Sequence, residues 1–246
     1  MTAPVFVVEH FDAGGGGRYV LDGPEGRHAV SVKRLRAGED VVLTDGSGRW
    51  ADCVVLDTEG KDRLILQLDS VHEEPAEEPR VTVVQALPKG DRGELAVETM
   101  TEVGVDAIVP WAAARCITQW KGDRGAKALG KWRATAREAG KQSRRVRFPE
   151  VAEAATTKQV GSLLAGADFA AVLHESGDTP LATAELPATG EIVLVVGPEG
   201  GVAPEELAQF EEAGAQAYRL GRSVLRTSTA GTAAAAVLLA RTGRWS

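Results

Sequence analysis

Residues 193–201, with the sequence VLVVGPEGG, decide the fold class of this chain. A β-branched apolar run that ends in Gly-Pro-Glu-Gly-Gly predicts a buried strand, followed by a loop whose backbone can approach a ligand closely. Residues 217–220 repeat the plan as a short strand, with Gly221 at its end and a small-residue helix after it. Two glycine loops at the carboxyl ends of neighbouring strands form a crevice in an open α/β sheet. A small-molecule site is therefore expected here.

The sequence from residue 81 onward alternates between strand-like and helix-like patterns. Strands are predicted at residues 81–87, 107–111, 169–173, 192–196 and 217–220. Helices are predicted at residues 94–103, 128–142, 204–213 and 229–241. Pro204 at a helix start, with Glu205 and Glu206 in the first turn, fits the rules for capping and the helix dipole. This alternation predicts an α/β fold with a mostly parallel sheet covered by helices on both faces.

The first 72 residues have a different pattern, which predicts a separate small domain. Short strands are expected at residues 5–8, 40–44, 51–56 and 63–71, with turns rich in Gly and Asp between them. Closely spaced strands of this kind predict a small β-barrel. Two segments stand apart from this pattern: residues 26–36 have helical spacing, and residues 14–17 predict a flexible glycine loop. The acidic, proline-bearing residues 73–80 predict a linker, which leaves domains at residues 1–72 and 81–246.

The composition is that of an ordinary globular protein. The chain has 246 residues, of which 43% are hydrophobic, and a net charge of −7. Its two cysteines, Cys53 and Cys116, lack metal-ligand spacing, so we interpret both as free, buried thiols in a reducing compartment. The N-terminus does not resemble a signal peptide, and no apolar run approaches the length of a membrane span. We therefore expect a cytoplasmic protein without a bound metal or a membrane partner.

Charge is distributed unevenly along the chain. Residues 115–147 contain 11 basic and two acidic residues, a local charge of +9 in a protein of net charge −7. A segment this basic in an acidic protein is a candidate surface for phosphate contacts. The alternative is a helix face that is simply solvated.

The glycine loop at residues 197–201 does not match the common nucleotide-binding motifs. It has neither the G-x-G-x-x-G spacing of a dinucleotide fold nor the G-x-x-x-x-G-K-[ST] of a phosphate loop. The sequence also lacks a serine nucleophile elbow and the H-E-x-x-H pattern of zinc hydrolases. Backbone recognition of a small molecule remains, with Glu199 available for a polar contact. The alternative is a tight structural turn before a helix.

Several sequence blocks, taken in order, resemble a known family. The blocks are LPKGDR at 87–92, GVD at 104–106, QSRR at 142–145, PE at 149–150, LHE at 173–175, VGPEGG at 196–201, LG at 220–221 and LRT at 225–227. In this order and spacing they resemble the ribosomal RNA small subunit methyltransferase E family of the SPOUT superfamily. The N-terminal RHAVSVKRLR at 27–36 resembles the opening segment of that family. The resemblance therefore covers nearly the whole chain.

This resemblance implies a fold and an activity. The larger domain would bind S-adenosylmethionine in a C-terminal trefoil knot, although threaded chains are rare exceptions among folds. The small domain would be a PUA-like barrel that engages RNA. The protein would be a homodimer that methylates N3 of one uridine in 16S ribosomal RNA of the 30S subunit.

The resemblance also implies roles for individual residues. Cofactor-binding residues would be Leu173, His174, Gly197, Glu199, Gly200, Gly201, Leu220, Gly221, Leu225 and Thr227. RNA-binding residues would include Arg27, His28, Lys33, Arg34, Arg36, Lys89, Arg92 and Arg144. Arg226 is the first candidate for a catalytic residue and Arg145 the second. Two alternatives stay open: His174 would otherwise be a core imidazole, and Arg34 and Arg36 would only pair with Glu39 and Asp40.

Two positions depart from the family pattern. Ser228 stands where the family commonly has glutamate after Leu-Arg-Thr, and Val146 stands where asparagine is usual. The identity of any general base is therefore open. Three other functions also remain: methylation of another ribosomal or transfer RNA nucleotide, a non-catalytic RNA-binding assembly factor, or a metabolite-binding protein without RNA.

Overall fold

The computed structural model describes residues 3–10 and 16–245. Residues 14 and 15 of the expected glycine loop thus lie outside the described residues. The chain forms two compact units. The first comprises Met1–Ala76 and Gly140–Phe148, and the second comprises Glu77–Ala139 and Pro149–Ser246.

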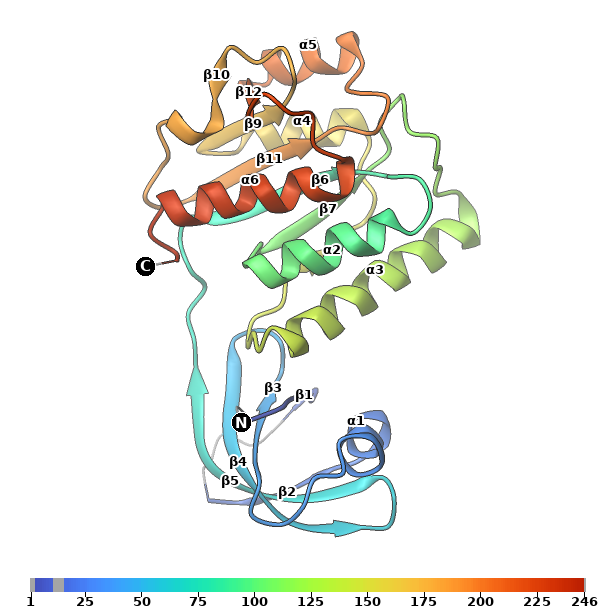
Figure 1. Ribbon diagram of the computed structural model, residues 1–246, viewed down its shortest axis with the longest axis vertical. Coiled ribbons are helices and arrows are strands. Elements are labelled where there is room, and N and C mark those ends of the chain that lie inside the picture. The colour runs from blue at the N-terminus through green and yellow to red at the C-terminus, as the bar shows by residue number, and fades with distance from the viewer. Residues whose placement is uncertain (1–2, 11–15, 246) are drawn as a thin grey trace. The chain divides into compact units, whose positions relative to one another are not determined.

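The first unit is built on a five-stranded sheet in the order β1-β3-β4-β5-β2. Its strands are β1 (Val5–Val7), β2 (Arg18–Leu21), β3 (Asp40–Thr44), β4 (Arg49–Glu59) and β5 (Arg63–Glu73). The β1–β3 pair is parallel and the other pairs are antiparallel. Register shifts along the β4–β5 pair bend the long strands, and the sheet curls around a core that includes Phe6, Leu43 and Leu66 (Figure 1).

The predicted helical segment of the first unit is shorter than expected and begins earlier. It consists of α1 (Gly23–Arg27) and a single π-helical turn, η1 (His28–Val32). Arg34 then adopts a left-handed conformation with φ of +56°, which ends the helix before residue 36. The ring of His28 packs edge-on against Phe6, with 6.0 Å between ring centroids, so this side chain contributes to the packing of the unit.

Residues 140–148 belong to the first unit, although the sequence prediction places them within 81–246. The Val146 carbonyl accepts a hydrogen bond of 2.9 Å from Thr44 Oγ1, and the Phe148 N–H donates to the Gly46 carbonyl at 2.8 Å. The Lys141 ammonium forms a 2.9 Å ion pair with Glu25, with side chains 5% and 14% exposed respectively. This segment is therefore an integral part of the unit.

The second unit is an α/β fold with a seven-stranded sheet in the order β10-β12-β9-β11-β6-β7-β8. The strands are β6 (Arg80–Ala86), β7 (Ala107–Trp111), β8 (Glu150–Val151), β9 (Phe169–Leu173), β10 (Thr179–Pro180), β11 (Glu191–Val196) and β12 (Gln216–Arg219). Every pairing in this sheet is parallel. The prediction of a mostly parallel sheet is confirmed.

Helices cover both faces of this sheet, as predicted. They are α2 (Arg92–Val103), α3 (Gly122–Gln142), α4 (Thr157–Ala165), α5 (Pro204–Glu212) and α6 (Thr227–Arg241), with the short η2 turn at Leu181–Thr183. Helices α2 and α6 lie side by side (Figure 1) and share one apolar core that contains Met100 and Leu238. Helices α4 and α5 pack together in a second core that contains Leu164 and Phe210. Helix α4 was not predicted from the sequence, and α3 begins six residues earlier than predicted.

The strand order places the carboxyl ends of three strands, β12, β9 and β11, next to one another. Strand β9 lies between β12 and β11, and Leu173 at its carboxyl end is level with Tyr218 of β12 and Val196 of β11. Because parallel strands end at the same sheet edge, the loops that follow them converge there. Within the described part of the chain, no helix is long and apolar enough to cross a membrane.

Candidate active site

A pocket of about 570 Å³ lies where the loops after β9, β11 and β12 converge. All ten residues that were predicted to bind a cofactor line it, so the three loops meet as predicted. Its wall also includes Arg92, Arg115, Glu175, Arg222 and Arg226. The volume lies within the range of pockets that hold small molecules and cofactors.

The loop after β11 needs glycine at two positions for different reasons. Gly201 has φ of +73°, a left-handed conformation that residues with side chains rarely adopt. A Cβ atom on Gly200 would lie 3.2 Å from Cβ of Arg115, because this arginine packs directly on the loop. The loop backbone is therefore open to the pocket on one side and held closely by its neighbours on the other.

Glu199 braces this loop against the segment before α2. Its Oε1 accepts a hydrogen bond of 3.2 Å from the Lys89 backbone N–H and lies 3.7 Å from Nη1 of Arg92. The side chains of Arg92 and Glu199 are 40% and 29% exposed, so the ion pair is open to solvent and contributes little to stability. Glu199 lies in the pocket wall, and its carboxylate fixes the loop there.

Arg115 holds the same loop from the other side and was missed as a site residue. Its Nη1 donates a 3.1 Å hydrogen bond to the Gly200 carbonyl. In the sequence, Arg115 counts only as the first residue of the basic segment. The available signal was its position in the loop after the predicted strand 107–111, since the carboxyl ends of parallel strands carry the sites of such folds.

His174 lies in the pocket wall and is half-buried, so the alternative of a core imidazole is wrong. Its Nδ1 lies 2.6 Å from Ser176 Oγ and accepts a hydrogen bond of 3.2 Å from the Ser176 N–H. The backbone N–H of His174 donates to the Tyr218 carbonyl at 2.9 Å. These bonds fix the loop after β9 next to the end of β12.

Arg226 and Ser228 lie in different surroundings although they are only two residues apart. Arg226 is the N-cap of α6; its exposed side chain lines the pocket, and its carbonyl accepts 2.9 Å hydrogen bonds from the N–H groups of Thr229 and Ala230. Ser228 is 3% exposed and is not among the residues that line the pocket. The position where the family commonly has glutamate is thus directed into the protein in this chain.

Arg145, the second catalytic candidate, and Arg144 belong to the segment that completes the first unit. Arg144 has φ of +60°. Arg145 is not among the residues that line the pocket.

The other predicted RNA-binding residues divide between the two units. Arg27, His28, Lys33, Arg34 and Arg36 follow one another along α1, η1 and the next turn of the first unit. Lys89 and Arg92 belong to the second unit. The alternative was that the guanidinium of Arg36 pairs with the carboxylate of Glu39 or Asp40. Instead, the backbone N–H of Arg36 donates a 2.6 Å hydrogen bond to the Glu39 carboxylate. No ion pair of Arg34 or Arg36 is found within the described residues.

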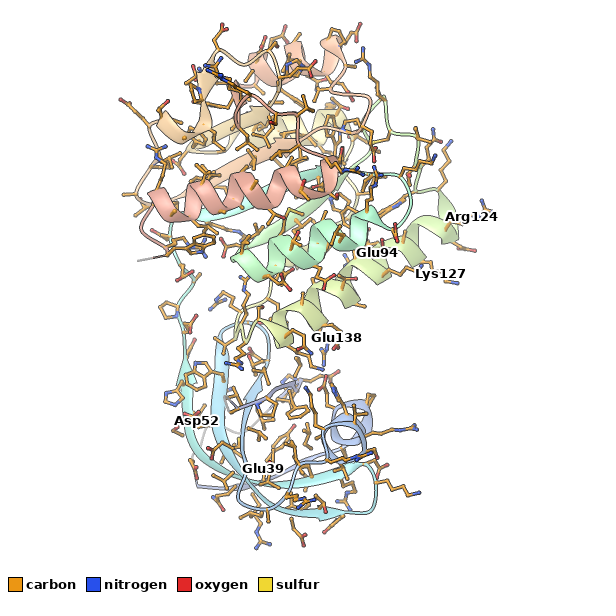
Figure 2. All side chains as sticks on the ribbon, in the orientation of Figure 1. Glu39, Asp52, Glu94, Arg124, Lys127 and Glu138 are labelled. Carbon is orange, nitrogen blue, oxygen red and sulfur yellow. The ribbon has the colours of Figure 1, made fainter. Side chains whose placement is uncertain are left out.

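The basic side chains of helix α3 are exposed in its first half, and some of those further along form ion pairs. Arg124 and Lys127 project from the first half of the helix (Figure 2), and both are exposed. Arg133 pairs with Glu153 at 3.0 Å, and Lys141 is buried against Glu25. The first half of α3 therefore remains a candidate phosphate-contact surface, whereas its end has a structural role in the first unit.

Both cysteines are free thiols, as predicted. Burial raises the pKa of Cys53 to about 12 and also raises the pKa of Cys116. Cys53 is buried, but Cys116 is only half-buried, which corrects one detail of the prediction. Among the described residues, no group of three or more His, Cys, Asp or Glu side chains could hold a metal ion.

The chain is similar to known RNA methyltransferases in both of its parts. The family model for the RNA methyltransferase domain matches residues 76–239, and the model for the RNA methyltransferase PUA domain matches residues 21–69. Ribosomal RNA small subunit methyltransferase E of Mycobacterium bovis is 46% identical over 230 residues, which cover 92% of this chain and 87% of that protein. The Bacillus subtilis protein of the same name is 29% identical over 220 residues, 86% of each chain.

Solved structures agree with the sequence comparison. The crystal structure of ribosomal RNA small subunit methyltransferase E from Neisseria gonorrhoeae, bound to S-adenosyl methionine, superimposes with a TM-score of 0.85. It is 29% identical in sequence, and the match covers 98% of both chains.

Proposed function

Because this chain belongs to the ribosomal RNA small subunit methyltransferase E family, we propose that it transfers a methyl group from S-adenosylmethionine to N3 of one uridine in 16S ribosomal RNA. The observation that carries the proposal is the pocket at the ends of β9, β11 and β12, which gathers every predicted cofactor residue. The relative from Neisseria gonorrhoeae, of the same name and fold, was solved with S-adenosyl methionine bound.

The residues of the pocket fit this cofactor. The backbone of the Gly200–Gly201 turn is exposed to the pocket, where a side chain would take up space needed by a ligand. Arg115 and Arg222 supply positive charge for a carboxylate, and Glu175 and Glu199 supply negative charge for a sulfonium or an amine. Leu173, Leu220 and Leu225 supply apolar contacts for a flat ring. When bound, S-adenosylmethionine supplies an electrophilic methyl group and leaves as a neutral thioether.

In this proposal, Arg226 stabilises negative charge on the target base. The N3–H of uridine is a weak acid, and the nitrogen must lose its proton before or during attack on the methyl group. A guanidinium next to the uracil carbonyls lowers the free energy of the resulting anion. Arg226 is suited to this role because its backbone is fixed at the start of α6 while its side chain remains exposed in the pocket. Arg145 is the second candidate.

RNA would be held by basic residues of both units. The candidates are Arg27, His28, Lys33, Arg34 and Arg36 of the first unit, Arg144 of its returning segment, and Lys89 and Arg92 beside the pocket loop. The match of residues 21–69 to the PUA domain model supports this assignment for the first unit. Binding through phosphate contacts weakens steeply as salt increases, because bound counterions are released.

The finer features of the family belong to the same proposal. Residues 1–72 of the first unit would form a PUA-like barrel, joined by residues 73–80 to a SPOUT methyltransferase domain with a C-terminal trefoil knot. That domain would occupy residues 81–246, except for the segment 140–148 that completes the first unit. The protein would act in the cytoplasm as a homodimer, on the 30S subunit and without a metal. The small residues of α6, from Ala230 to Ala236, suit either the close packing of a knot or a dimer interface.

The experiment that tests the proposal is methyl transfer to 30S subunits from a strain that lacks this enzyme. Labelled S-adenosylmethionine is supplied, and the modified nucleoside is identified by mass spectrometry. We expect N3-methyluridine at a single 16S position. Label in a different nucleoside of the 30S subunit, or label in transfer RNA supplied in a parallel reaction, would contradict the proposed substrate. Cofactor binding without transfer to any RNA would indicate a non-catalytic binding protein.

A further inference from the structure

Glu206 is a buried carboxylate that links three segments of the second unit. It lies in the first turn of α5 and is 6% exposed. Its Oε1 accepts 2.9 Å hydrogen bonds from the Ala114 N–H and from Thr157 Oγ1, and its Oε2 accepts a 3.2 Å bond from the Ala203 N–H. It thereby connects the loop after β7, the first turn of α4 and the N-cap of α5.

Two of these bonds belong to a closed ring of contacts that includes the glycine loop itself. Ala114 precedes Arg115, whose guanidinium donates to the Gly200 carbonyl at 3.1 Å. The chain then runs from Gly200 through Gly201 and Val202 to Ala203, whose N–H returns to Glu206. Glu206 therefore holds the loop after β11 directly at its end and, through Arg115, at its middle.

The ring requires a carboxylate at position 206. Three donors converge on the two oxygens of Glu206, and no ion pair of this residue is found within the described part of the chain. The negative charge is stabilised by these donors and by its place at the N-terminus of α5. A glutamine has a single acceptor oxygen, so its amide group would face one of the three donors and break the ring.

We propose that Glu206 is a positioning residue for the cofactor pocket: it acts through Arg115 to hold the backbone of Gly200 and Gly201 in the form that binds S-adenosylmethionine. This inference rests on the proposed function. It extends the site to a buried side chain that does not line the pocket and to an arginine that the resemblance did not assign. Neither residue needs to touch the transferred methyl group.

The decisive comparison is between Glu206→Gln and Glu205→Gln. Both substitutions remove one negative charge from the first turn of α5, but Glu205 is exposed. We expect Glu206→Gln to raise the Kd for S-adenosylmethionine about tenfold, corresponding to ~1.4 kcal/mol. Glu205→Gln should leave it within about twofold of the original protein. Isothermal titration calorimetry on the full chain measures both.

Arg115→Ala tests the second half of the ring independently of Glu206. If Glu206 acts in part through Arg115, the double variant should lose less affinity than the sum of the two single losses, because both changes break the shared link through Arg115. Arg115→Lys keeps one charged donor, and it should recover part of the affinity that Arg115→Ala loses. Independent, additive losses would overturn the inference.

Steady-state kinetics separate positioning from a general loss of folded protein. We expect Glu206→Gln to raise KM for S-adenosylmethionine, with a smaller change in kcat. A purely structural role would instead lower the melting temperature and the apparent kcat while KM and Kd stay unchanged, which would contradict the inference. If the unsubstituted protein itself fails to bind S-adenosylmethionine, the proposed function fails, and the inference fails with it. If the original protein binds and Glu206→Gln binds equally well, only the inference fails.

Discussion

The guanidinium of Arg244 lies 2.6 Å from Oε2 of Glu77, which joins the end of the described chain to the first residue of the second unit. Arg244 also bonds both oxygens of Asp106, at 2.5 and 3.1 Å, and its side chain is only 5% exposed. Burial by itself lowers the pKa of this guanidinium, but the bonds to Asp106 and Glu77 outweigh it and raise the pKa above its ordinary value. The cluster is thus a charge network near the amino-terminal ends of β6 and β7, in which the side chains of Arg244 and Asp106 are largely buried and that of Glu77 is exposed.

Replacing Arg244 with alanine should destabilise the protein by about 2–3 kcal/mol, since Asp106 would remain buried without its partner. The loss of stability is smaller than for a fully buried ion pair, because the second partner of Arg244, Glu77, is 56% exposed and stays hydrated. Urea unfolding measures the change. Arg124→Ala, on the exposed side of α3 (Figure 2), removes the same charge and should change stability by less than about 0.5 kcal/mol. Equal effects of the two variants would show that the network does not stabilise the fold.

The Cys53 thiol should be almost unreactive in the folded protein. With a pKa of about 12, only about one thiol in ten thousand is ionised at pH 8, and the thiolate is the reactive form. Labelling by a thiol reagent, with the site identified by mass spectrometry, should be slow for Cys53 until denaturant is added. Rapid labelling of this residue in the native state would contradict the burial found here.

The same shift gives a dependence of stability on pH. The folded thiol keeps its proton up to about pH 12, whereas an unfolded thiol loses it near 9. The folded state therefore binds more protons between these values, so its contribution to stability is complete below pH 9 and falls as the pH rises toward 12. Cys53→Ala should reduce the slope of stability against pH in this window.

Arg226→Ala should reduce kcat by at least about 100-fold, as expected when a group that stabilises developing charge is removed. The Kd for S-adenosylmethionine should change by less than about threefold, because the backbone bonds of residue 226 at the start of α6 do not depend on its side chain. Arg63→Ala, at an exposed ion pair of the first unit, is the control for lost charge. Turnover at the original rate would remove Arg226 from the mechanism.

Ser228→Ala should leave kcat within about twofold of the original protein. The hydroxyl-bearing side chain is 3% exposed and does not line the pocket, so it is not in a position to accept a proton from the substrate. Single-turnover methyl transfer at saturating cofactor measures the chemical step directly. A tenfold loss would assign Ser228 a part in catalysis despite its burial.

Arg34→Gly should separate RNA binding from stability. Its left-handed backbone, with φ of +56°, is costly for arginine but not for glycine. The melting temperature should therefore stay the same or rise, while affinity for 30S subunits falls and the slope of log K against log salt decreases by about 0.7–0.9. Arg34→Lys, which keeps the charge, should bind nearly as well as the original protein. Unchanged affinity of Arg34→Gly would exclude Arg34 from the RNA interface.

The sequence predicted the parts of this protein that depend on local pattern. The β-branched run before Gly197 and the glycines after it predict a strand and an open loop without knowledge of any neighbour. Helix α4 was missed although its signal was present: Thr156 and Gln159 form a capping box, T-x-x-Q, at its start. This signal is short and has no long apolar stripe after it.

The features that escaped prediction depend on contacts between distant residues. Arg115 reaches Gly200 across 85 positions, and Glu206 reaches Ala114 across 92. The position of β11 between β9 and β6 determines these contacts, and no local pattern fixes that order. The helical spacing of residues 128–142 likewise continues smoothly past residue 139, so it carries no sign that the chain then joins the first unit.

Residues 140–148 lie far along the chain but belong to the first unit, and this limits how the gene can be truncated or recombined. A fragment that stops at the linker would lack Phe148, whose ring lies against Gly46, and Arg147, whose Nη2 donates to the Glu74 carbonyl at 2.6 Å. The first unit therefore cannot be exchanged between homologues by a single crossover. A chimaera that keeps both units intact needs three junctions, at 76/77, 139/140 and 148/149. Recombination at the linker alone would combine residues 1–76 of one homologue with residues 140–148 of another. This favours inheritance of the two units together.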